Sequence, residues 1–223
     1  IHLLDSFLNF KFFSIIFTAF CLLILINGSN FIDGININLI CYYLLITIIF
    51  YYLSLTSLDF DLEKKDLLII IISLVVILIL NLLGKITSGD GGAYLISFFW
   101  GINLINLSTQ NQNISPFFIV LLLWYPAFEN LFSIIRKLKL KKSALNADFK
   151  HFHQLLYLVI KSKIKNKKIA NNFSGLIISF YNFIIFLIAI NYYHHTQTLV
   201  ILILFSVFIY LFSYFKILSN LRR

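Results

Sequence analysis

Long apolar segments separated by polar connections run through the whole chain. Most are long enough for an α-helix to cross the hydrocarbon core of a bilayer, which takes roughly 17–25 residues. The segments are apolar on every face, whereas the strands of a membrane β-barrel alternate in polarity and are about ten residues long. The pattern therefore predicts about seven transmembrane helices, at 10–26, 38–55, 67–83, 93–107, 117–135, 173–190 and 199–217.

The charges of the connections predict an orientation. Seven spans place alternate connections on opposite sides of the membrane. The side formed by 27–37, 85–92, 136–172 and the C-terminal tail carries 15 of the 18 Lys and Arg residues. Because basic residues accumulate in cytoplasmic connections, we expect this side to face the cytoplasm and 136–172 to be a basic cytoplasmic loop.

The composition supports a membrane protein and excludes other classes. The 223 residues are 60% hydrophobic and 12% charged, whereas a soluble domain has about 25% charged residues. Cys21 and Cys41 lie in apolar runs, so neither a disulfide framework nor a zinc site is indicated. The net charge of +9 is explained by topology and by attraction to anionic headgroups, and no nucleic-acid partner is expected. We predict one all-α transmembrane domain over 1–223, a polytopic helical bundle.

The first polar cluster is Asn27-Gly-Ser-Asn30-Phe-Ile-Asp33-Gly34-Ile-Asn36, at the end of the first span. Asn30 and Asp33 would share one face of a continuing helix, because residues three apart are neighbours. An amide and a carboxylate can bind the hydroxyls or the base of a nucleotide. The alternative is a helix end followed by a polar turn.

The second cluster is Thr87-Ser-Gly89-Asp90-Gly91-Gly92, between the third and fourth spans. Glycines around one aspartate predict a tight loop at a helix N-terminus with free backbone N–H groups. Asp90 could bind Mg²⁺ while these N–H groups face phosphate oxygens. The alternative is that Asp90 is only the N-cap of the fourth span.

The third and fourth clusters lie in and before the basic loop. In Asp148-Phe-Lys-His151-Phe-His153-Gln154, the histidines could bind a phosphate or transfer a proton, or be an exposed pair. Pro126 in the fifth predicted span should kink that helix near Glu129 and Asn130. A structural role for Glu129 is as plausible as a catalytic one. The first three clusters all fall on the predicted cytoplasmic side, as an active site facing the cytoplasm requires.

In this order and at these spacings, the motifs resemble the polyprenyl-phosphate N-acetylhexosamine-1-phosphate transferases of glycosyltransferase family 4. The resemblance covers 22–36, 89–98 and 123–154. It implies a helical bundle with a cytoplasmic cleft in the bacterial cytoplasmic (inner) membrane. It further implies transfer of a sugar 1-phosphate from a UDP-sugar to undecaprenyl or another polyprenyl phosphate, releasing UMP. That reaction initiates cell-envelope polysaccharides such as lipopolysaccharide O-antigen, teichoic acid or peptidoglycan.

The resemblance also implies roles for individual residues. Asp90 would bind Mg²⁺, or Mn²⁺ in its place, and nearby Lys and Arg would hold the lipid phosphate. His151 and His153 would contact the donor phosphates, and these histidines with Asp90 are the catalytic candidates. The candidate nucleoside-binding residues are Asn30, Asp33 and Asn36.

The chain departs from the family pattern at several points. Asn36, Phe149 and Gln154 stand where many members have Asp, Arg and His. The family's paired aspartates lie upstream of all the motifs present here. We therefore expect this chain to be the C-terminal portion of a longer transferase and to be inactive alone. The fold is compatible with a homodimer.

Two other hypotheses remain open at this point. A transporter or lipid flippase would need polar residues spread through the middle of its spans, whereas these are concentrated at span ends. An inactive, truncated relative of the transferases is the second alternative.

Overall fold

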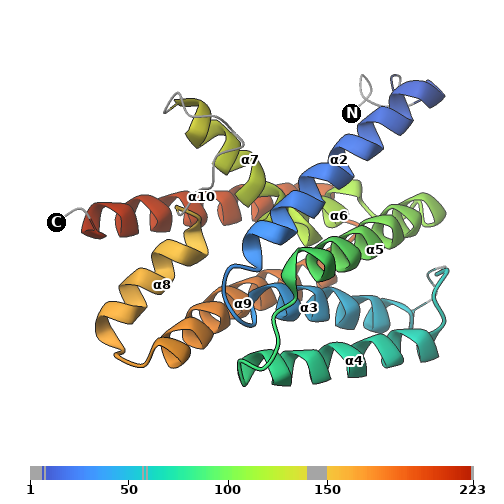
Figure 1. Cartoon of the computed structure of the whole chain (residues 1–223). Helices are drawn as coiled ribbons and strands as arrows, with labels where there is room; N and C mark the ends of the chain where they lie inside the picture. The colour runs from blue at the N-terminus through green and yellow to red at the C-terminus, as the bar shows by residue number, and fades with distance from the viewer. Residues whose placement is uncertain (1–6, 8, 57, 59, 140–149, 222–223) are drawn as a thin grey trace.

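The computed structural model describes residues 7, 9–56, 58, 60–139 and 150–221, and this part of the chain forms an all-helical bundle (Figure 1). This confirms the predicted fold class. The helices are α2 (Lys11–Ile32), α3 (Asn38–Leu53), α4 (Lys64–Leu82), α5 (Gly89–Gln110), α6 (Pro116–Leu122), α7 (Trp124–Lys139), α8 (Phe152–Lys163), α9 (Lys167–Asn191) and α10 (Thr196–Leu221).

Several of these helices indicate a membrane-embedded protein, but fewer than seven are long and apolar enough to span. Within the described ranges α2, α4, α9 and α10 meet both conditions, and the bent pair α6–α7 would make a fifth span. The count of seven is therefore more than the structure shows. The two remaining segments fall short for different reasons. Helix α3 has only 16 residues, and α5 carries Gly, Ser and Asn along its 22 residues.

Helix α3 forms the centre of the bundle. It packs against α4, α5 and α9, so that it is enclosed on several sides (Figure 1). Its side chains Tyr42, Tyr43, Ile46, Phe50 and Leu53 are all buried. A helix that is apolar all round must be surrounded by other apolar groups. In α3 these groups are mainly other helices of the protein, whereas α4 and α10 expose many large apolar side chains.

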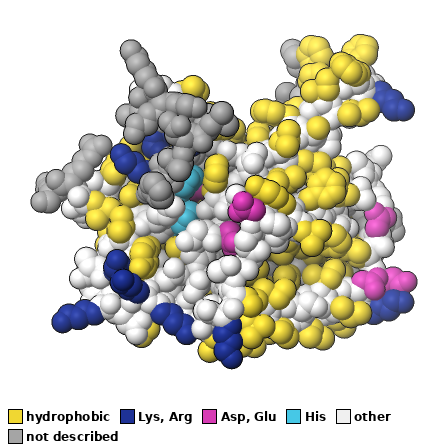
Figure 2. Space-filling view, in the orientation of Figure 1, with side chains coloured by type: hydrophobic (Ala, Val, Ile, Leu, Met, Phe, Trp, Pro, Cys, Tyr) yellow, Lys and Arg dark blue, Asp and Glu magenta, His cyan; other side chains and the backbone are white. Residues whose placement is uncertain are grey.

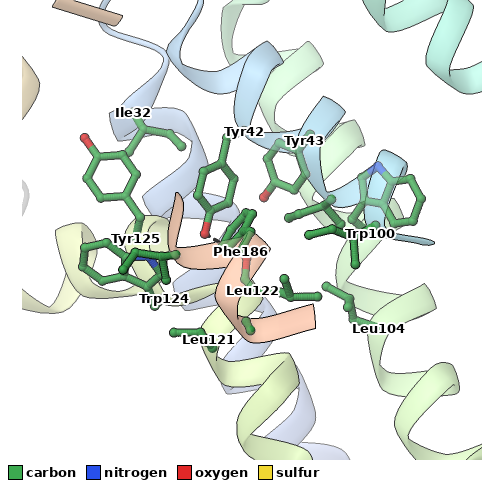
Figure 3. Packing of buried hydrophobic residues seen from close by; sticks show 14 of the residues in the cluster. Ile32, Tyr42, Tyr43, Trp100, Leu104, Leu121, Leu122, Trp124, Tyr125 and Phe186 are labelled. Atoms are coloured by element: carbon green, nitrogen blue, oxygen red, sulfur yellow. Dashed lines mark hydrogen bonds between the residues drawn. The ribbon is translucent and has the colours of Figure 1, made fainter. Parts of the chain in front are cut away.

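The fifth predicted span is broken into α6 and α7, whose axes differ by 71°. The break lies at Leu123, just before Pro126, which was expected to kink this segment. Proline has no N–H, so the carbonyl four residues earlier loses its helical partner. That carbonyl belongs to Leu122, and the Tyr42 hydroxyl donates to it at 2.8 Å. Figure 3 shows Tyr42 in this position, packed near Tyr125 and Phe186.

Helices α2 and α7 cross closely at a glycine. A Cβ placed on Gly28 would overlap the backbone carbonyl of Pro126. Only glycine allows this approach of the two backbones. The crossing brings the C-terminal part of α2, with the first polar cluster, next to the segment that carries Glu129.

The region 136–172 is not a single loop. It contains the end of α7, all of α8 and the start of α9, whereas residues 140–149 lie outside the described part. Phe149 is among those undescribed residues. We use the term polar end for the end of the bundle formed by 33–37, 83–90, 150–153 and 164–166.

Candidate functional site

The polar end brings together segments that are far apart in the sequence. The connection between α2 and α3 contacts the connection between α4 and α5, the start of α8 and the first turns of α9. Figure 2 shows histidine side chains beside acidic side chains near the middle of one face, with Lys and Arg below and to the left of them. The three sequence clusters that carry Asn30, Asp90 and His151 therefore lie at one end of the molecule.

Asparagine side chains fix the connection between α2 and α3. The Asn36 N–H donates to Asn171 Oδ1 at 2.7 Å, and Asn36 Nδ2 donates to Asn172 Oδ1 at 2.9 Å. The Ile37 N–H donates to Asn81 Oδ1 at 2.6 Å. Ile37 has φ 75°, a conformation that a β-branched residue rarely adopts. These bonds hold a strained turn in place, and Asn36 is engaged in anchoring it.

The connection is also packed closely against α9. A Cβ on Gly175 would overlap the Asn36 carbonyl oxygen, so a larger residue would displace the turn. Asn30 lies in the last turn of α2, where its carbonyl accepts the Asp33 N–H at 3.3 Å. Its side chain is partly exposed, at the edge of the polar end.

Asp33 and Asp90 lie on separate elements, and Asp33 interacts with Ser88 and Gly89, the residues just before Asp90. Asp33 is the C-cap of α2, and Asp90 is an exposed residue in the first turn of α5. Burial raises the pKa of Asp33 to about 6; the neighbouring Ser88 hydroxyl and Gly89 N–H oppose this rise, and the Asp90 carboxylate adds to it. The alternative that Asp90 is an N-cap is wrong, because Ser88 occupies that position.

Two carboxylates at the start of α5 and the end of α2 suit a divalent cation only in part. Magnesium commonly uses one or two carboxylates, with water and substrate phosphates completing its six ligands. No group of three or more His, Cys, Asp or Glu in the described residues could hold a metal alone. Asp33 and Asp90 therefore fit Mg²⁺ only as part of a site that phosphate oxygens and water would complete.

His151 is held by a buried carboxylate. Glu129 is fully buried on α7, and its Oε1 lies 2.9 Å from His151 Nδ1. His151 precedes α8, and its N–H donates to Gln154 Oε1 at 3.2 Å. Gln154, which stands where many members of the resembling family have histidine, thus stabilises the start of α8. It is a capping residue in this structure.

His153 is buried beside the first cluster, with no hydrogen bond to either ring nitrogen from the described residues. A Cβ on Gly34 would overlap its Nε2, so the glycine allows close contact between the two clusters. Its ring stacks on that of His151 with centroids 5.7 Å apart. Burial lowers the pKa of His153 to about 4, although the charge of Glu129 partly opposes this. His153 is therefore neutral at pH 7.

Lysines surround the polar end without forming a compact cluster. Lys168 Nζ donates to the Leu83 carbonyl at 2.7 Å, which satisfies the end of α4. Lys161, Lys163, Lys165 and Lys167 are exposed around the connection between α8 and α9. This placement suits contact with anionic headgroups at a membrane surface.

An apolar cavity of about 410 Å³ lies at the bend between α6 and α7. Side chains from five helices line it, among them Cys21, Leu25, Ile105, Trp124, Phe128 and Val207. Almost all of this lining is apolar. A hydrocarbon chain is the kind of molecule that such a surface can bind, because burial of apolar area is the main source of affinity there.

The sequence did not single out several residues that build the polar end. Asn81, Asn171 and Asn172 anchor the turn, and Tyr210 binds Glu129. Asn81 could have been noticed as a polar residue inside an apolar run, and Asn171–Asn172 as a doublet before a span. Tyr210 gave no signal, since aromatic residues occur throughout the apolar segments.

Comparisons with known proteins neither support nor oppose the family resemblance. No protein-family model matches the chain, and searches of curated proteins and of solved structures give no significant match. The resemblance therefore stays a prediction based on the motifs themselves.

Proposed function

We propose that the protein takes part in the transfer of a sugar 1-phosphate from a UDP-sugar to a polyprenyl phosphate, with release of UMP. The observation that carries this proposal is the meeting of three distant motifs at the polar end. Gly34 contacts His153, and Asp33 interacts with Ser88 and Gly89 at the start of α5, although these residues are separated by up to 120 positions in the sequence. A reaction at the headgroup level of a membrane requires such a polar site at one end of a helical bundle.

The donor would bind between the carboxylates and the histidines. Asp90 and Asp33 would hold Mg²⁺, which when bound would neutralise charge on the pyrophosphate and on the leaving UMP. Asn30 would contact the nucleoside from the end of α2. The family role of Asn36 is less direct here, since its main-chain N–H and side-chain amide are both bonded to α9.

His151 would face the donor phosphates, and His153 would support it from behind. The His153 ring is fully buried against Gly34 and stacks on His151, so it would hold the first cluster and the His151 ring in place. His151, paired with Glu129, can present a polarised ring to the same phosphates. Preorganised donors of this kind lower the barrier by stabilising charge that develops in the transition state.

The acceptor would approach from the lipid phase. The cavity at the bend between α6 and α7 is apolar and lies among candidate membrane helices, as an isoprenoid chain requires. Exposed lysines near α8 would attract its phosphate at the membrane surface. We propose that the polar end faces the cytoplasm of a bacterial inner membrane, in line with the basic residues concentrated there.

The direct test uses the protein expressed from the complete reading frame that contains this chain. Purified protein is mixed with a UDP-N-acetylhexosamine, polyprenyl phosphate and Mg²⁺, and both UMP and the lipid-linked sugar are measured. The proposal predicts equal amounts of the two products. No UMP with any UDP-sugar donor would contradict it, and movement of substrate across proteoliposomes without UMP would favour a transporter.

A further inference from the structure

Glu129 is the most completely enclosed carboxylate among the described residues. It has no exposed surface, and three donors from two other segments, the start of α8 and α10, surround it. His151 Nδ1 lies 2.9 Å from Oε1, and the Phe152 N–H donates to the same oxygen at 3.2 Å. The Tyr210 hydroxyl, on α10, donates to Oε2 at 2.8 Å. A single carboxylate thus links α7, α8 and α10.

These bonds determine the form of the His151 ring. An ionised carboxylate only accepts hydrogen bonds, so His151 must donate through Nδ1–H. Its Nε2 is then the ring nitrogen left for another partner. The ring also packs against the rings of Phe31 and His153, whose centroids lie 4.7 and 5.7 Å from its own. The tautomer and the orientation of the ring are therefore both fixed.

We propose that Glu129 is a positioning residue for the transfer reaction: it accepts from His151 Nδ1–H and stabilises the form of the ring in which Nε2 is also protonated and donates to the donor phosphates. This inference rests on the proposed function of the polar end. A carboxylate behind a histidine orients the imidazole and stabilises its charged form in many enzymes. Burial of a carboxylate costs free energy unless the carboxylate is fully paired. A charged residue at this position therefore favours a role that a neutral residue could not fill.

In the described part of the chain, the titratable groups that interact with Glu129 include His151 and His153, together with Tyr125 on α7 and Tyr210 on α10. Further along α7, Arg136 donates to Tyr214 at 3.0 Å, and this places its charge next to α10. Removal of the Glu129 charge should therefore change the electrostatic environment of the two histidines most.

Glu129→Gln distinguishes a role for the Glu129 charge in positioning His151 from a role for its side chain in packing the helices. The glutamine oxygen can still accept from His151 and Phe152, and its amide can donate to the Tyr210 oxygen, so the three segments stay linked. The negative charge alone is lost. Asn130→Ala is the matched control, because Asn130 is a buried neighbour on α7 whose amide donates to the Ile24 carbonyl at 3.0 Å.

The test measures UMP release by the protein from the complete reading frame, as a function of pH. Glu129→Gln is expected to lower kcat by about 100-fold with KM for the UDP-sugar changed less than about threefold. The pH profile of kcat should change in Glu129→Gln, because the imidazole loses the charged carboxylate that accepts from its Nδ1–H. Glu129→Asp should restore part of kcat, and Asn130→Ala should leave the pH profile in place. Full activity of Glu129→Gln with an unchanged profile would overturn the inference.

A second measurement keeps this inference separate from the proposed function. If the wild-type protein releases no UMP, the proposed function fails, and the ¹⁵N spectrum of the imidazole rings still tests the role of Glu129. The His151 signal, identified by its loss in His151→Asn, should show Nδ1–H in the wild type and a changed tautomer ratio in Glu129→Gln. Identical spectra for the two proteins would overturn the positioning role.

Discussion

Asn81 joins the two connections that form the polar end, so its replacement should separate them. Its Oδ1 accepts the Ile37 N–H at 2.6 Å, and its Nδ2 donates to the Ile86 carbonyl at 3.0 Å. Asn81 is 3% exposed and Ile37 2% exposed, so water cannot easily replace these bonds. Asn81→Leu removes both bonds with little change in volume.

The expected loss follows from the two bonds. Each contributes about 1 kcal/mol, and a buried N–H left without a partner costs about 1–3 kcal/mol, whereas the apolar leucine returns about 1 kcal/mol. The net prediction is a decrease of about 2–4 kcal/mol in the free energy of unfolding. Ile37 also needs its bond to hold φ at 75°, so the turn that carries Asp33 and Asn36 should shift.

Denaturation in detergent, followed by helix content, measures the stability change. Asn103→Leu is the control, since the Asn103 amide donates to the Phe99 carbonyl within its own helix, α5, at 2.8 Å. Its loss should cost about 1 kcal/mol or less. If Asn81→Leu and Asn103→Leu have the same free energy of unfolding and the same affinity for UMP, Asn81 does not hold the two connections together.

Two further predictions concern the helix crossing and the buried histidine. Gly28→Ala should destabilise the protein by about 1–3 kcal/mol, because the new Cβ would overlap the Pro126 carbonyl. Gly91→Ala is the control and should be neutral or stabilising, because Gly91 lies in open space on α5. Equal effects of the two substitutions in thermal unfolding would contradict the close crossing of α2 and α7. Burial lowers the pKa of His153 to about 4, so the unfolded chain binds a proton at this histidine at a higher pH than the folded protein does. The free energy of unfolding should therefore fall by up to about 3 kcal/mol as the pH decreases from about 6.5 to about 4. His153→Gln should reduce this loss in pH-dependent unfolding, and an undiminished acid sensitivity would show that another group is responsible.

Local hydrophobicity was enough to predict helices but not their ends or breaks. The first span was expected to end at 26, yet α2 continues to Ile32, because Gly28, Ser29 and Ile32 are buried against other helices. The fifth span breaks at Leu123, where a hydroxyl from α3 replaces the N–H that Pro126 lacks. Such tertiary partners cannot be read from a local pattern.

The candidate site was predictable in outline only. Counting spans and charges placed the three motifs on one side, and in the structure they lie at one end of the bundle. The bonds that hold them, such as Asn36 to Asn171 and Asn172, connect positions about 135 residues apart. Glu129 and His151 were noticed separately, but their pairing depends on how α7 and α8 pack, which no spacing rule provides.

The central claim is that carboxylates of the polar end support phosphosugar transfer to a polyprenyl phosphate. It is tested most directly by UMP release from the complete protein with a UDP-N-acetylhexosamine, polyprenyl phosphate and Mg²⁺, in the wild type, Asp90→Asn and Asp61→Asn. Asp61 is the control, because this carboxylate accepts from Asn106 at 2.8 Å, away from the polar end. The account predicts lipid-dependent release in the wild type and Asp61→Asn, and a loss of at least about 100-fold in Asp90→Asn. Full activity of Asp90→Asn, or release that does not need the lipid, would contradict it.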